Sequence, residues 1–218
     1  MKLLLLHSPL VGPATWMALA PALRARGHDV MVPDLRPALR EGRPFYAALA
    51  ALIAAVPDED AVAVVHSGAG ALAPLLGAVR GAIFIDAVLP HPGQSWFDGV
   101  PPELGARLRG LAKDGRLPPW HAWWPKGAME RLLPDRAQGA AFIAEQDELP
   151  LAYFEEAAPA VPLAMPSAYL QLSEAYAADA DAADALGWPV ERLALDHLAV
   201  LSRPTLVVDA IQRLADEF

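Results

Sequence analysis

The chain has 218 residues, no cysteine and a formal net charge of −9. That length fits one domain, or one domain with an inserted segment. The lack of cysteine excludes disulfides, thiolate metal sites and a cysteine nucleophile. The negative charge argues against nucleic acid and an anionic membrane surface as partners, because both attract clustered Lys and Arg. No run of about 18 apolar residues predicts a membrane span, so we expect a soluble, cytoplasmic protein.

Short apolar runs alternate with helical patterns over the first 90 residues. The pattern predicts strands at 3–6, 30–32, 61–65 and 82–85, and helices at 16–26, 44–56 and 70–79. The strand runs are apolar throughout, which is typical of strands buried on both faces of a parallel sheet. Such alternation favours an α/β protein with helices on both faces of the sheet.

The alternation stops at residue 91 and resumes near residue 163. Residues 91–162 instead hold many prolines, short amphipathic stretches and four of the six tryptophans. Beyond them, strands are predicted at 167–172 and 190–195, and helices at 175–186 and 204–215. We therefore expect a core formed by residues 1–90 and 163–218, with about six mostly parallel strands, and a helical cap formed by residues 91–162.

Ser67 lies directly between a predicted buried strand and a predicted helix, in the sequence V-V-H-S-G-A-G. A serine on such a turn is exposed above its strand, and its small neighbours Gly68 and Ala69 permit a tight backbone. The helix N-terminus adds positive partial charge, and the Gly68 N–H is placed to hold an oxyanion. We favour Ser67 as a nucleophile. The alternative is a serine that only caps the helix.

His197 follows the last predicted strand, and His7 follows the first. A histidine in the position of His197 can take the proton of an attacking serine, although a lone loop histidine is more often a surface residue. His7 is expected to line the same pocket. The spacings H-E-x-x-H and H-x-x-E-H do not occur, so neither a metal nor another cofactor is expected.

The Ser67 segment resembles the nucleophile elbow of the α/β-hydrolase family, G-x-S-x-G, although Val65 and Ala69 occupy the glycine positions. The resemblance covers nearly the whole chain and implies an α/β-hydrolase fold without the usual first two antiparallel strands. It also implies an acid that orients the histidine. Glu174 is the first candidate, because most of the family places the acid after the penultimate strand. Asp86, at the position used by a minority, is the second.

The segment from His7 to Trp16 resembles the first oxyanion loop of the plant methylesterase and hydroxynitrile lyase branch. In that branch the second residue after the histidine donates its N–H to the oxyanion. Here that residue is Pro9, which has no N–H, and Ser8 replaces a glycine. Loss of one donor costs about 10²–10³ in rate. Either the Leu10 N–H or the Ser8 hydroxyl substitutes, or the chemistry needs less stabilisation of the oxyanion.

At least one of Trp120, Trp123 and Trp124 is expected to line the pocket, although each can equally serve to attach the cap. Together these features predict a serine hydrolase that acts on an ester, thioester or lactone of a small apolar or aromatic molecule. Two alternatives stay open. One is a lyase or isomerase that uses the serine and histidine for acid–base chemistry, and the other is a ligand-binding protein with a decayed site. The expected partner is a small molecule, with a homodimer as a further expectation.

Overall fold

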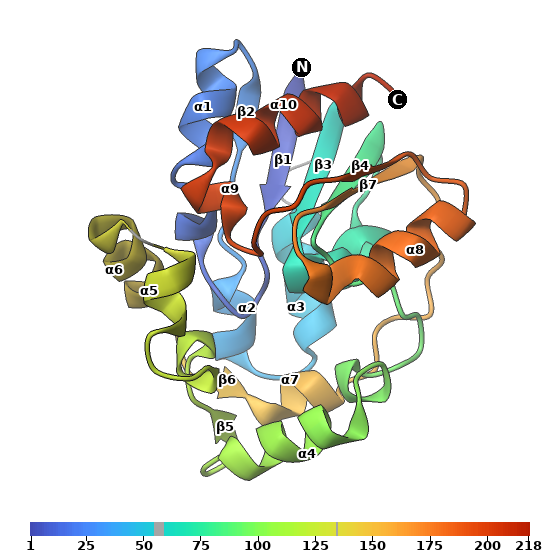
Figure 1. Ribbon diagram of the computed structural model, residues 1–218. Helices are drawn as coiled ribbons and strands as arrows, with labels where there is room; N and C mark the ends of the chain where they lie inside the picture. Colours follow the sequence, from blue (N-terminus) through green and yellow to red (C-terminus); the bar gives the residue numbers. More distant parts are fainter. Residues whose placement is uncertain (55–58, 134) are drawn as a thin grey trace.

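The computed structural model describes residues 1–54, 59–133 and 135–218 (Figure 1). Its centre is a six-stranded sheet in the order β2-β1-β3-β4-β7-β8, in which all neighbouring strands are parallel. The prediction of about six mostly parallel strands is confirmed. The strands are β1 (Lys2–Leu6), β2 (Asp29–Met31), β3 (Ala61–His66), β4 (Gly81–Ile85), β7 (Ser167–Gln171) and β8 (Val190–Arg192).

The central strands are buried on both faces because successive side chains point to opposite sides of the sheet. Leu3 and Leu5 lie in one apolar core, and Leu4 and Leu6 lie in the other. Burial of such a side chain contributes about 1.5–3 kcal/mol, so the two cores together fix the register. The first core also takes alternate residues of the neighbouring strands, namely Val62, Val64, Ile83, Ile85, Ala168 and Leu170.

Helices cover both faces of the sheet (Figure 1). On the first face, α1 (Leu19–Ala25) packs against α10 (Pro204–Ala215), whose buried side chains Val207 and Ile211 join the core of Leu3. On the second face lie α3 (Phe45–Ala54) and α8 (Ala177–Ala185). The other helical elements of the core are η1 (Pro13–Trp16), α2 (Arg36–Glu41), η5 (Glu174–Tyr176) and α9 (Ala199–Ser202).

The predicted helices and strands differ from the structure in extent at several places. The predicted helix 70–79 is instead a 3₁₀ helix, η2 (Ser67–Leu75), which starts at the serine and contains Pro74. A proline inside a helix cannot donate its backbone hydrogen bond, which favours this short, tight form. The predicted strand 190–195 ends as a strand at Arg192. Residues 55–56, the end of the predicted helix 44–56, lie outside the described residues.

The cap segment (residues 91–162) consists of short helices together with a two-stranded antiparallel sheet that the sequence did not predict. Its carboxylates bind backbone of the core: Glu156 accepts the N–H groups of Phe45 and Tyr46 at 3.1 and 2.9 Å. Its division from the core at residues 91 and 162 stays a prediction. The elements are η3 (Trp96–Asp98), α4 (Pro102–Leu111), β5 (Arg116–Leu117), η4 (Trp120–Trp123), α5 (Ala128–Leu132), α6 (Arg136–Ala144), β6 (Leu149–Pro150) and α7 (Leu151–Glu155).

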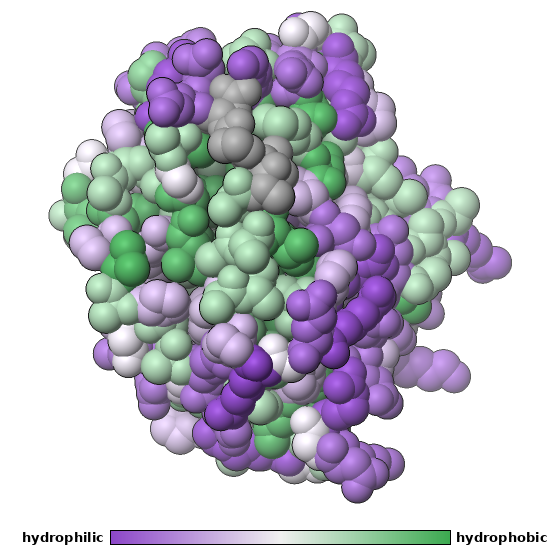
Figure 2. All heavy atoms as spheres, turned by 180° about the vertical axis from the view of Figure 1, so that it is seen from behind, coloured by the Kyte–Doolittle hydropathy of each residue, from purple (hydrophilic) through white to green (hydrophobic). Residues whose placement is uncertain are grey.

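The rear of the molecule carries hydrophobic residues over its middle and hydrophilic residues along one side (Figure 2). The most exposed large apolar side chain is Leu186, just after α8, at 64%, and Trp124 in the cap segment is 41% exposed. Scattered apolar residues of this kind are normal on a globular surface. Among the described residues, no helix has the length and apolar character needed to cross a bilayer.

Candidate active site

Ser67 occupies a strained turn at the carboxyl end of β3. Its φ of 57° lies in the left-handed region, which residues other than glycine rarely adopt. The Ser67 N–H donates to the Asp86 carbonyl at 3.1 Å, and the Val88 N–H donates to the Ser67 carbonyl at 3.2 Å. A side chain at Gly70 would collide with the Val88 carbonyl, so the turn needs a glycine there. Strain held by surrounding contacts is typical of a nucleophile elbow.

His197 reaches the site from the loop before α9, and the buried carboxylate of Asp86 orients it. The His197 Nδ1–H donates to Asp86 Oδ2 at 3.1 Å. The carboxylate also accepts the Leu172 N–H at 2.6 Å, the Ser173 N–H at 3.0 Å and the Ser173 hydroxyl at 2.5 Å. Because Asp86 holds the proton on Nδ1, the Nε2 atom of His197 is left unprotonated and can act as a base.

Asp86 is a charged group in spite of its burial. Burial alone would raise the pKa of the Asp86 carboxyl, but the hydrogen bonds from His197, Ser173 and Leu172 outweigh it and lower the pKa below its ordinary value. A negative charge at this position favours the positive imidazolium that forms when a histidine accepts a proton. The electrostatics of the site therefore suit general base chemistry.

The expected order of the two candidate acids is wrong, because Asp86 and not Glu174 contacts His197. Glu174 is an exposed residue of η5. The reason lies in the turn after β7, which directs the N–H groups of Leu172 and Ser173 toward Asp86. Asp86 has a φ of 40° at the end of β4, so its side chain faces this turn from the neighbouring strand.

The imidazole of His197 lies between two other rings. His66 stacks on it at a centroid distance of 4.6 Å, and Tyr176 stacks on it at 5.0 Å with an angle of 9° between the planes. The His66 Nε2–H donates to the His197 carbonyl at 3.0 Å. Burial, and then the neighbouring His197, lower the pKa of His66 to about 3, so His66 is neutral. The two rings leave His197 little freedom to turn.

Tyr176 is the residue of this site that sequence reasoning missed. Its hydroxyl lies 3.2 Å from Ser67 Oγ. Its position in η5, immediately after the penultimate strand, was the signal available, because that is where an acid was sought. The sequence there offers both a carboxylate, at Glu174, and a phenol two residues beyond it.

A hollow that is open to solvent lies beside Ser67. Trp120 lines it and approaches the His197 ring at 6.3 Å, as expected for at least one of the three tryptophans. Trp123 instead is buried and donates its indole N–H to the Pro118 carbonyl, and Trp124 is largely exposed. The whole lining is formed by Ser8, Leu10, Val11, Thr15, His66, Ser67, Trp120, Phe142, His197 and Leu198.

The loop after β1 approaches the serine through Ser8. Ser8 is 2% exposed, and a Cβ added to Gly68 would lie 2.8 Å from Ser8 Oγ, so the hydroxyl adjoins the backbone that follows the nucleophile. Ser8 Oγ accepts the Leu10 N–H at 3.3 Å. The Leu10 N–H is thereby engaged within the loop. Since a serine hydroxyl also has one hydrogen to donate, Ser8 is the better placed of the two candidate donors.

His7 does not line the hollow, contrary to expectation. Its Nδ1–H donates to the Ser8 carbonyl at 2.8 Å, and its Nε2 accepts the Leu35 N–H at 3.1 Å. Burial lowers the pKa of His7 to about 4, so the ring is neutral at physiological pH. His7 therefore holds the loop of Ser8 in place and takes no proton in the site.

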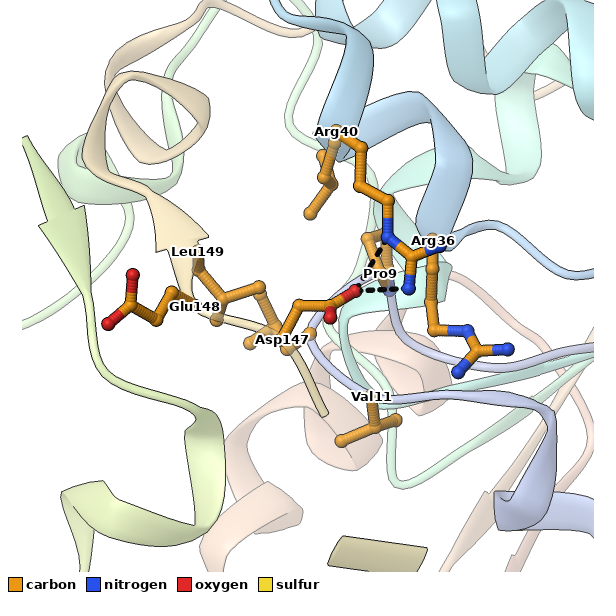
Figure 3. Close-up of a pocket in the computed structure, with 9 residues that line it drawn as sticks. Pro9, Val11, Arg36, Arg40, Asp147, Glu148 and Leu149 are labelled. Atoms are coloured by element: carbon orange, nitrogen blue, oxygen red, sulfur yellow. Dashed lines mark hydrogen bonds and ion pairs between the residues drawn. The ribbon is translucent and has the colours of Figure 1, made fainter. Parts of the chain in front are cut away.

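The same loop borders a second hollow that is open to solvent (Figure 3). Pro9 and Val11 lie at its base, and Arg40 from α2 binds Asp147 across it at 2.6 Å. The hollow contains no serine or histidine. The Arg40–Asp147 ion pair links the cap segment to α2. We assign no chemistry to this second hollow.

The described ranges contain no group of three His, Cys, Asp or Glu side chains that could hold a metal ion. The groups that the site brings together are a serine on a strained turn, a histidine oriented by a carboxylate, and two hydroxyls, from Ser8 and Tyr176.

The parallel sheet and the serine turn at the end of β3 define the α/β-hydrolase fold, and solved structures share it. An extracellular α/β-hydrolase from a Paenibacillus species has a TM-score of 0.77 and 20% identity, with 98% of each chain covered. A pyrethroid hydrolase from Sphingobium faniae has a TM-score of 0.70 and 22% identity, covering 99% of this chain and 97% of the other. A mutant of polyneuridine aldehyde esterase has a TM-score of 0.72 and 17% identity, covering 99% and 98%.

Comparison with protein-family models gives no match, and neither does a sequence comparison with curated proteins. The identities to the solved structures are low, so these neighbours show the fold and leave the activity to be argued from the site.

We predict that Asp86→Asn destabilises the protein more at neutral than at acid pH. The lowered pKa of Asp86 means that its charged form stabilises the folded state above the ordinary value of 3.8, and that this contribution is lost as the pH falls through the lower folded-state pKa. At pH 7 we expect the free energy of unfolding to fall by more than about 1.5 kcal/mol, the scale of one hydrogen bond to a charged group. Urea unfolding at neutral pH and near pH 3 measures it.

The matched control is Glu174→Gln, a carboxyl-to-amide change at an exposed position nearby. We expect it to leave the free energy of unfolding nearly unchanged at both pH values. An equal loss for Asp86→Asn at both pH values would contradict the charged state assigned to Asp86.

Proposed function

We propose that the protein is a serine hydrolase that acts on an ester, thioester or lactone of a small apolar or aromatic molecule. The observation that carries this proposal is the hydrogen bond from His197 to the buried Asp86, beside a serine held on a strained turn. Two of the structural neighbours are named as a pyrethroid hydrolase and an esterase, which supports ester hydrolysis as the reaction type. A cytoplasmic location remains a prediction from the sequence.

In the proposed reaction Ser67 Oγ forms a bond to the substrate carbonyl carbon while its proton passes to His197 Nε2. Asp86 stabilises the imidazolium. The tetrahedral intermediate collapses as the bond to the leaving group breaks, and the leaving oxygen or sulfur takes the proton from His197. A water molecule then attacks the acyl-enzyme, again losing its proton to His197, and releases the acid and the free serine.

The negative oxygen of the tetrahedral intermediate needs hydrogen-bond donors in place before the reaction starts. The first proposed donor is the Gly68 N–H, next after the nucleophile. The second is the Ser8 hydroxyl, which compensates for the missing N–H at Pro9. The short distance between Ser8 Oγ and the position of a Gly68 Cβ supports this pairing, because the Ser8 hydroxyl adjoins the residue that carries the first proposed donor.

The substrate class follows from the lining of the hollow. Its walls are mainly apolar, with Trp120, Phe142, Val11 and Leu198 around the polar groups of the serine, the histidines and Thr15. Such a lining favours an apolar or aromatic group next to the scissile carbonyl. No cofactor is needed for this chemistry, and a small molecule is the proposed partner.

Ser67→Ala tests the proposal. A fluorophosphonate reacts by forming a bond between Ser67 Oγ and phosphorus while fluoride leaves, so intact mass spectrometry should show the adduct on the wild type and none on Ser67→Ala. The variant should fold normally, because it loses one hydroxyl. The wild type should also hydrolyse p-nitrophenyl acetate, and Ser67→Ala should not.

Ser167→Ala is the matched control, because Ser167 begins β7 at the opposite end of the sheet from Ser67. It should label at the wild-type rate. Labelling of Ser67→Ala at the wild-type rate would overturn the assignment of the nucleophile. A wild type that neither labels nor hydrolyses the ester would favour the two alternatives, a lyase or isomerase and a ligand-binding protein.

Ser8→Ala tests the second oxyanion donor. We expect kcat for p-nitrophenyl acetate to fall by about 10²–10³, the effect of removing one such donor, with a much smaller change in KM. The reason is that the oxyanion exists only in the transition state and the intermediate. A kcat within threefold of the wild type would show that the Ser8 hydroxyl does not hold the oxyanion.

A further inference from the structure

Ser67 Oγ is hydrogen-bonded to Tyr176 and not to the proposed base. The two hydroxyl oxygens lie 3.2 Å apart. In the part of the chain that the structure describes, no hydrogen bond joins Ser67 Oγ to His197 Nε2. Ser67 Oγ and His197 Nε2 must therefore come into hydrogen-bond geometry before His197 can take the serine proton.

We propose that Tyr176 is a positioning residue that holds the Ser67 hydroxyl in a resting orientation and must release it before acylation. The inference rests on the proposed role of Ser67 as a nucleophile. The parallel stacking of Tyr176 on His197, at 5.0 Å, explains the competition, because the phenol and the imidazole approach the same serine side by side. Tyr176 thus sets how often the serine is available to the base.

Both possible directions of the hydrogen bond hold Ser67 Oγ beside Tyr176. If Ser67 donates, its hydrogen points toward Tyr176 and away from His197. If Tyr176 donates, it occupies a lone pair of Oγ and fixes the position of that atom. Burial raises the pKa of the Tyr176 phenol to about 12, so the hydroxyl keeps its hydrogen at neutral pH.

A role in packing alone would not need the hydroxyl. The ring of Tyr176 stacks on His197, and a phenylalanine ring would do the same. The hydroxyl instead contacts the atom that is to react. Tyr169, in the preceding strand β7, is a contrasting case. Its hydroxyl donates to the Ala87 carbonyl at 2.8 Å and so contacts backbone only.

The proposed competition affects only the first half of the reaction. In the acyl-enzyme, Ser67 Oγ has no hydrogen and is a poor acceptor, so Tyr176 has nothing to hold. Removal of the phenol hydroxyl should therefore speed acylation and leave deacylation unchanged. One neutral hydrogen bond predicts a change of about two- to tenfold.

Tyr176→Phe keeps the stacked ring and removes the hydroxyl, and stopped-flow reaction with p-nitrophenyl acetate separates the two steps. We expect the rate constant of the burst, which reports acylation, to rise about two- to tenfold, with an unchanged steady-state rate set by deacylation. Inactivation by a fluorophosphonate, a single step at the same oxygen, should accelerate by the same factor. Tyr46→Phe is the same change in α3, at a buried tyrosine outside the lining of the hollow, and it should alter none of these rates.

The outcomes separate this inference from the proposed function. If the wild type labels through Ser67 but Tyr176→Phe acylates at the wild-type rate or more slowly, the resting role of Tyr176 is overturned and the serine hydrolase stands. If Tyr176→Phe changes the rates of acylation and deacylation by the same factor, the hydroxyl affects the structure of the whole site, and the inference again fails. If the wild type does not label at Ser67, both fall together.

Discussion

Asp86 accepts hydrogen bonds from His197, Leu172 and Ser173 through one buried carboxylate, and its backbone carbonyl accepts the Ser67 N–H. The carboxyl ends of parallel strands meet at one edge of a sheet. A carboxylate at the end of β4 can therefore join the serine turn after β3, the turn after β7 and the histidine loop. The relative positions of the candidate nucleophile and base depend on this single residue, through its backbone carbonyl and its carboxylate.

The same group explains how ionisable residues coexist in a buried place. Its hydrogen bonds keep Asp86 charged, and that charge lies against His197, which lines the hollow. The other two buried histidines nearby, His7 and His66, are neutral because burial lowers their pKa values. Both form hydrogen bonds to backbone groups and so hold the loops around the site in place. We therefore assign proton transfer to the imidazole of His197.

Periodicity and the serine turn predicted the sheet, Ser67 and His197 because these depend on patterns that a sequence displays directly. The choice between Asp86 and Glu174 depended on which way the backbone turns after β7, and no apolar pattern reports that direction. The sequence did not predict a role for Tyr176 for a related reason. Only the path of the backbone after β7 brings its hydroxyl to Ser67. The sequence also left open whether the Ser8 hydroxyl or the Leu10 N–H is the second oxyanion donor. The structure favours Ser8, because the Leu10 N–H already donates to Ser8 Oγ.

The most direct test of the account compares kcat/KM for p-nitrophenyl acetate in Asp86→Asn and Glu174→Gln. An asparagine cannot hold His197 in the same tautomer, and the comparable change in a serine protease triad lowers kcat by about 10⁴. The account predicts a loss of that order for Asp86→Asn and a change of less than about threefold for the exposed Glu174→Gln. A near-normal Asp86→Asn together with a strongly impaired Glu174→Gln would contradict it.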